Sequence, residues 1–180
     1  MTMPPSARYT GPAIALHWLL ALMILVSLGV GLYMTGLPMG LQRLKLYNWH
    51  KWAGVTILLL SAARLLWRLA HRPPPDVPMP AWQAKAAHAL HWALYAAFFA
   101  VPLSGWAYSS SAGFPIVWFG VLPLPDFVPA DKPLSETLKI AHHFAAYTLG
   151  ALVIAHVAAA LKHQFLDRDG LLARMGVGRA

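Results

Sequence analysis

The sequence predicts an all-α integral membrane protein, an up-and-down four-helix bundle with a short amphipathic C-terminal helix. Three observations indicate this fold class. Of 180 residues, 58% are hydrophobic and only 11% are charged, whereas an average soluble domain has about 25% charged residues. Four apolar stretches each reach the roughly 20 residues that a helix needs to cross a bilayer. Histidines lie in or beside these stretches, and ionisable residues in a membrane span usually mark a functional site.

The four predicted spans cover about residues 13–34, 46–69, 83–108 and 137–162. Because they use most of the chain, we expect a single domain over residues 1–180 and no separate soluble catalytic module. The first span is too long for the core of a signal peptide, and no small-residue cleavage site follows it, so we expect it to be retained.

Composition excludes several kinds of protein. The formal charge is +8, but the basic residues lie near span ends, so we expect contacts with membrane lipids and no nucleic-acid binding. The chain has no cysteine, which excludes disulfides, iron–sulfur clusters and covalent haem attachment. Histidine and methionine remain as the nitrogen and sulfur ligands for a metal.

The first two spans each carry one histidine near their start. His17 lies one turn inside the first span, beside Trp18, and needs a partner there unless it is a simple interfacial residue. His50 opens the second span between Trp49 and Trp52. Because successive spans run in opposite directions, His17 and His50 are expected in opposite leaflets.

The third span follows a proline-rich linker, which marks a helix boundary. It carries His88 and His91 near its start, three residues apart and therefore on one helix face. They lie on the same side of the membrane as His17, so they compete with it for a cofactor. The long apolar loop over residues 109–136 is expected to form an interfacial lid, and the C-terminal tail is expected to lie on the membrane surface.

The fourth span carries His142 and His156, which are 14 residues apart. In a helix this spacing separates them by about 21 Å along the axis and only about 40° around it. One helix face thus offers an imidazole at each edge of the bilayer, which suggests two haem irons. By depth, His50 pairs with His142 at the outer site and His17 with His156 at the inner site. His143 is the rival to His142, but it lies about 100° further around the helix.

Two arginines are candidates to bind the haem propionates. Arg64 and Arg68 lie four residues apart on one face at the end of the second span. Arginine binds carboxylates bidentately. The alternative is that both side chains extend to lipid headgroups.

The distribution of basic residues predicts that both termini face the cytoplasm. Nine lie on the side of the termini, and five lie on the other side. The nine are Arg8, Arg64, Arg68, Arg72, Lys85, Lys162, Arg168, Arg174 and Arg179, and the five are Arg43, Lys45, Lys51, Lys132 and Lys139.

These features occur in an ordered set: a His-Trp pair in the first span, a histidine opening the second, RLLWRL before prolines, HALH in the third, and two histidines 14 residues apart in the fourth. The set resembles the bacterial cytochrome b561 family over about residues 13–175. The resemblance implies a multi-pass protein of the bacterial inner membrane that binds two haem b groups and reduces or oxidises quinone. It also implies that the iron ligands are His17, His50, His142 and His156.

Two functions are compatible with this resemblance. Some family members are described as superoxide oxidases, which pass an electron from periplasmic superoxide to ubiquinone. The positive rim of Arg43, Lys45 and Lys51 near His50 fits such an anionic donor, although the same residues can simply contact headgroups. His88 or His91 is then expected to contact the quinone. The alternative is a haem-b anchor subunit that accepts electrons from a partner dehydrogenase or hydrogenase. A di-metal hydroxylase is disfavoured because the spans contain no Asp or Glu.

Overall fold

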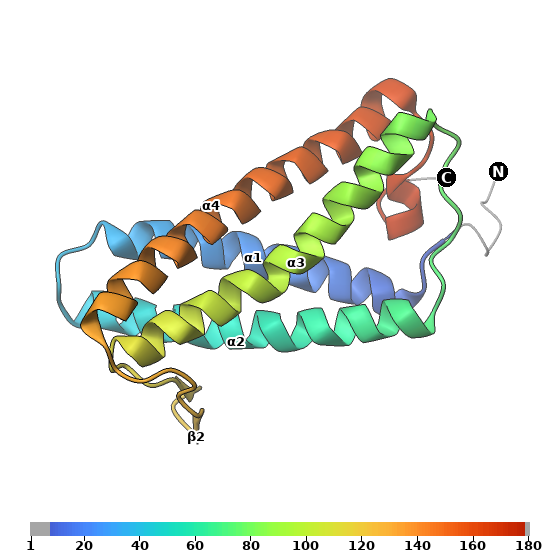
Figure 1. Ribbon diagram of the computed structural model, residues 1–180. Coiled ribbons are helices and arrows are strands. Elements are labelled where there is room, and N and C mark those ends of the chain that lie inside the picture. Colours follow the sequence, from blue (N-terminus) through green and yellow to red (C-terminus); the bar gives the residue numbers. More distant parts are fainter. Residues whose placement is uncertain (1–7, 179–180) are drawn as a thin grey trace.

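The computed structural model describes residues 8–178 and contains four long helices. They are α1 (Gly11–Thr35), α2 (Leu41–Ala70), α3 (Ala81–Ser111) and α4 (Lys132–Lys162). All four are long and apolar enough to cross a membrane. The start of α1 and the end of α4 lie at the same end of the bundle (Figure 1). The predicted all-α, up-and-down membrane bundle is therefore confirmed. Arg179, one of the basic residues used to predict orientation, lies outside the described residues.

The helices extend beyond the predicted spans because their polar ends continue past the apolar part. The start of α4 shows why. Asp131 precedes the helix, and its side chain accepts a hydrogen bond of 2.7 Å from the backbone N–H of Leu134. Such an N-cap satisfies one of the free N–H groups of the first turn. Pro133 lies in that turn, where proline is tolerated because its missing N–H is not needed.

The bundle packs as two helix pairs, α1 with α2 and α3 with α4 (Figure 1). Buried apolar side chains from all four helices meet in one core, formed by Leu20, Ile24, Ile57, Leu94 and Leu149. On α4 this core lies midway between the two histidines of the helix. It therefore separates the outer end of the bundle from the inner end, where the termini lie.

The loop between α3 and α4 covers the outer end and contains a small hairpin. Its strands, β1 (Val117–Trp118) and β2 (Leu122–Pro123), pair antiparallel. The indole N–H of Trp52 on α2 donates a hydrogen bond of 2.6 Å to the carbonyl of Val117. Figure 1 shows the hairpin at the end opposite the termini. The sequence predicted this loop as a lid. It did not predict the strands, because two-residue strands are too short to show an alternation of apolar and polar residues.

The C-terminal segment forms two short helices instead of one regular amphipathic helix. The π-helix η2 (His163–Asp167) continues α4, Arg168 adopts a left-handed conformation (φ 53°), and η3 (Leu172–Met175) is a 3-10 helix. The segment folds back onto the bundle, a contact that the sequence did not predict. The Trp18 indole donates to the Met175 carbonyl at 3.0 Å, and the Arg174 guanidinium donates to the Pro75 carbonyl at 2.5 Å.

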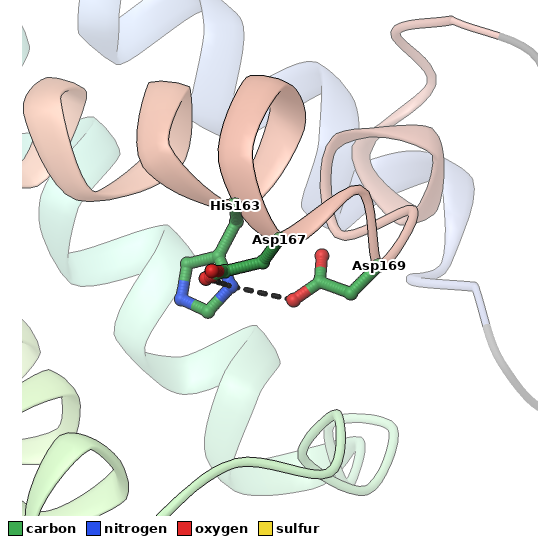
Figure 2. A group of neighbouring side chains, drawn as sticks. All are labelled: His163, Asp167 and Asp169. Carbon is green, nitrogen blue, oxygen red and sulfur yellow. Dashed lines mark hydrogen bonds and ion pairs between the residues drawn. The ribbon is translucent and has the colours of Figure 1, made fainter.

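A polar cluster joins the end of α4 to this segment (Figure 2). His163 Nδ1 lies 2.5 Å from a carboxylate oxygen of Asp169 and 3.3 Å from one of Asp167. These three side chains have the chemistry of metal ligands, but Lys162 Nζ already pairs with Asp167 at 2.5 Å. The other Asp169 oxygen accepts the backbone N–H of Leu171 at 3.0 Å. The cluster is therefore satisfied within the protein and closes the turn after α4.

Candidate cofactor sites

The outer candidate site lies between α2 and α4. The ring centroids of His50 and His142 are 6.2 Å apart, and the ring planes are 81° apart. When two imidazoles bind one first-row metal from opposite sides, each nitrogen lies about 2 Å from the metal and the ring centroids lie about 6 Å apart. The two rings are therefore spaced as a pair of axial ligands would be.

The inner candidate site lies between α1 and α4. His17 and His156 have ring centroids 6.1 Å apart and an interplanar angle of 61°. This is the same separation as at the outer site. Helix α4 thus presents one histidine to each site, and α1 and α2 supply one facing histidine each. The structure brings together the two pairs that the sequence spacing predicted.

The other histidines take different places. His143 is adjacent to His142, with ring centroids 6.4 Å apart, but it is His142 that faces His50. His91 lies 5.3 Å from His156 by ring centroids, which is closer than an intervening iron allows. His88 does not reach the inner site, because its Nε2 pairs with Asp76 of the linker at 2.8 Å and its side chain is 59% exposed.

A cavity lined by His50 and His142 has the chemistry that a porphyrin site needs. Its lining is apolar apart from the two histidines and Ser27, and consists of Ile24, Ser27, Leu28, His50, Gly54, Ile57, Phe98, Val101, Pro102, His142, Ala146 and Leu149. A Cβ atom at Gly54 would meet nothing within 4 Å. An apolar lining with two facing imidazoles suits a haem, so these residues fit the cofactor that the sequence suggested.

The predicted propionate ligands line a second, more polar cavity at the inner end. Arg64 donates a hydrogen bond of 3.3 Å to the carbonyl of Ala13, and the Arg68 guanidinium lies 5.9 Å from the ring centre of Tyr95. Both arginines therefore belong to the same end of the bundle as His17 and His156. Arginine at this position has the chemistry to bind a carboxylate, and the role of both residues as propionate ligands stays a prediction.

Two glycines that the sequence reasoning missed allow the outer histidines to pack closely. A Cβ atom at Gly105 of α3 would lie 2.9 Å from His142 Cε1, and one at Gly31 of α1 would lie 3.2 Å from His50 Cε1. Each ring therefore rests against the backbone of a neighbouring helix. Small residues in apolar helices often mark close contacts, but the sequence does not show which ring each glycine contacts.

The predicted positive rim of the outer site is partly used for structure. Arg43 donates at 2.8 Å to the Tyr47 hydroxyl and at 2.8 Å to the Leu37 carbonyl. Lys51 Nζ reaches the carbonyls of Phe114 and Pro115 at 3.3 and 3.4 Å. Lys45 is exposed. Within residues 8–178 the Lys45 side chain forms no hydrogen bond or ion pair, so its ammonium group is left to solvent.

A four-helix membrane bundle with facing histidine pairs near both ends is the arrangement of membrane cytochromes of the b type. Residues 8–178 match the family model for prokaryotic cytochrome b561. The chain belongs to this family, and the resemblance seen in the sequence is confirmed. It is therefore a haem-binding protein of a bacterial membrane that takes part in electron transport.

Curated relatives cover nearly the whole chain. Cytochrome b561 homolog 2 of Escherichia coli is 32% identical over 173 residues, which is 93% of this chain and 90% of the relative. Cytochrome b561 homolog 1 of the same organism is 31% identical, covering 93% and 96%. A probable superoxide oxidase, CybB of Yersinia pestis, is also 31% identical, covering 93% and 95%.

Proposed function

We propose that this chain binds two haem b groups and passes electrons from a periplasmic one-electron donor, superoxide, to membrane ubiquinone. The observation that carries the proposal is the pair of facing histidines at each end of the bundle, 6.2 and 6.1 Å apart. Haem with two histidine ligands has no open coordination position, so it exchanges electrons and does not bind oxygen. The proposed ligands are His50 with His142 at the outer site and His17 with His156 at the inner site.

Superoxide as the donor is supported by the charge at the outer end. Arg43, Lys45 and Lys51 lie on the first part of α2, the helix that carries His50, and positive charge near a site increases the rate at which an anion arrives. One relative that covers the chain almost completely is a probable superoxide oxidase. With both termini in the cytoplasm, the outer end faces the periplasm.

The residues around the inner site support quinone as the acceptor. His91 is exposed and lies beside His156. Its imidazole can form a hydrogen bond with a quinone oxygen. Arg64 and Arg68 are proposed to bind the haem propionates on the same side. His91 is preferred to His88 because His88 is turned outward to Asp76.

The direct test uses purified protein. A pyridine haemochrome assay should give two haem b groups per chain. Superoxide should reduce them in a stopped-flow experiment, and ubiquinone should reoxidise them, with the reduction abolished by added superoxide dismutase. One haem per chain, or a reduction that dismutase does not prevent, would contradict the proposal.

Electrostatic steering can be tested separately at Lys45. We expect Lys45→Gln to slow haem reduction by superoxide a few-fold at low ionic strength and little at 0.5 M salt, because salt shortens the screening length. The matched control is Lys85→Gln, which removes an exposed lysine at the opposite end of the bundle. Equal rates for wild type and Lys45→Gln at low salt would argue against steering.

The anchor-subunit alternative is favoured by one feature, the apolar surface of the outer hairpin. Phe119, Val121 and Leu122 are 58%, 83% and 51% exposed, and they offer a contact surface to a partner subunit or to lipid. Purification from mild detergent distinguishes the two functions. A dehydrogenase or hydrogenase that copurifies and reduces the haems from its own substrate, with no response to superoxide, would favour the anchor.

A further inference from the structure

The Nδ1 atom of each outer histidine has a hydrogen-bond partner on a neighbouring helix that does not carry the other histidine of the pair. His142 Nδ1 lies 3.1 Å from the carbonyl of Val101 and 3.2 Å from the hydroxyl of Ser104, both on α3. The Ser104 hydroxyl donates its own proton to that carbonyl at 2.8 Å. Its oxygen is left as an acceptor, so His142 carries its proton on Nδ1 and keeps the Nε2 lone pair for a metal.

His50, on the other helix pair, also has a serine hydroxyl beside Nδ1. Its Nδ1 lies 3.3 Å from the hydroxyl of Ser27 on α1. If Nε2 binds a metal, Nδ1 must carry the proton, and Ser27 then acts as the acceptor. Helices α2 and α4 thus supply the outer ligands, and α1 and α3 supply the acceptors that orient them.

The inner histidines have a different environment. Within residues 8–178, no hydrogen bond joins a ring nitrogen of His17 or His156 to another protein group. A cation lies at this end of the bundle, because the Arg64 guanidinium donates a hydrogen bond of 3.3 Å to the carbonyl of Ala13, one turn before His17 on α1. The two candidate sites therefore share their ligand type and differ in what surrounds the ligands.

We propose that Ser27, Ser104 and the Val101 carbonyl are positioning groups that give the outer haem the lower midpoint potential of the two. An acceptor at Nδ1 makes the imidazole a more basic ligand, which stabilises ferric iron. A cation near the inner site stabilises the more negative, reduced form instead. Both effects favour the electron at the inner site, so transfer from the periplasmic side to the cytoplasmic side is downhill. This inference rests on the proposed histidine ligation, and its direction on the predicted orientation, but not on the identity of the donor or the quinone.

The test is a spectropotentiometric titration of the purified holoprotein, which should resolve two waves. Ser27→Ala, Ser104→Ala and the double variant should shift the lower wave upward and leave the upper wave in place. Arg64→Gln should shift the upper wave downward. Ser104→Thr, which keeps the hydroxyl, should restore the wild-type potential, as an effect of packing alone would not.

The matched control is Thr148→Ala on α4, whose hydroxyl bonds only to the carbonyl of Phe144 of its own helix. Neither wave should move in this variant. If the serine variants move the upper wave, or if the double variant moves neither, the inference is overturned. Haem content measured on the same samples separates the two proposals. Fewer than two haems in the wild type overturns the ligation, whereas two haems with the opposite assignment of the waves overturn only the order of the potentials.

Discussion

Adjacent residues of α4 can have different roles because each step along a helix rotates the side chain by about 100°. His142 faces His50 across the outer cavity, whereas the neighbouring ring of His143 does not take part in that pair. The sequence favoured His142 by its alignment with His156, and the structure brings the same residue to the site.

This difference gives a prediction for single substitutions. We expect His142→Ala to lose the outer haem, so that the pyridine haemochrome count falls from two to one or fewer per chain. We expect His143→Ala to keep both haems and the wild-type reduced-minus-oxidised spectrum. If His143→Ala loses a haem and His142→Ala does not, the ligand assignment is wrong.

The glycine beside His142 provides a second prediction. In Gly105→Ala the new Cβ would lie 2.9 Å from His142 Cε1, so either the ring or helix α3 must move. Overpacking of this kind typically costs about 1–3 kcal/mol, and we expect reduced occupancy of the outer haem, measured by haem content and thermal stability. Gly29→Ala is the control, because a Cβ atom there meets nothing within 4 Å. Equal haem content in both variants would show that the ring has room to shift.

Some residues of the sites could not be predicted from the sequence. The four paired histidines could, because periodicity and depth in the span identify them. Ser27 and Gly31 could not, because small residues are common in apolar helices and only tertiary packing shows which ring they touch. His88 and His91 share a helix face, and the sequence offers no reason to separate them. The contact between His88 and Asp76 comes from the path of the linker.

At the scale of elements, the ends of helices were harder to predict than the helices themselves. The tail has the composition of an amphipathic helix, so the sequence predicted one on the membrane surface. The structure replaces it with a π-helix, a left-handed residue and a 3-10 helix, because the polar cluster of His163, Asp167 and Asp169 turns the chain back. Side chains that stabilise a turn leave no periodic pattern.

The role of this cluster can be tested with Asp169→Asn, which removes the charge beside His163 and keeps an oxygen for the Leu171 N–H. A hydrogen bond to a charged group contributes about 1.5–3 kcal/mol. We therefore expect the tail to open more often and trypsin to cleave after Arg168 several-fold faster, with haem content unchanged. Glu136→Gln is the control, since it removes an exposed carboxylate far from the tail. An unchanged cleavage rate would mean that packing alone fixes the segment.

At the scale of the whole molecule, the bundle followed directly from the sequence because length, apolar content and turn residues all point to four spans. The orientation remains a prediction from the excess of basic residues at one end. It places the hairpin in the periplasm and the segment after α4 in the cytoplasm.

The absence of native cysteines makes this orientation simple to test. We expect Val121→Cys, at a position that is 83% exposed on the hairpin, to react with a membrane-impermeant maleimide applied to cells with a permeable outer membrane. Arg168→Cys should react only after the inner membrane is opened. The cysteine-free parent is the control. The reverse pattern of labelling would invert the topology and place the superoxide-facing end in the cytoplasm.

Because α4 contributes a histidine to both sites, the spacing along this one helix sets the distance between the sites. A one-residue insertion between His142 and His156 would turn one ring by about 100° and lengthen the interval by about 1.5 Å, so one of the two facing pairs would be lost. Adding two full turns would restore the direction of the rings but lengthen the interval by about 11 Å, so His142 and His156 could no longer both lie level with His50 and His17. In a protein with this architecture the loops and the tail can therefore vary, but the number of residues between the two histidines of α4 has to remain constant.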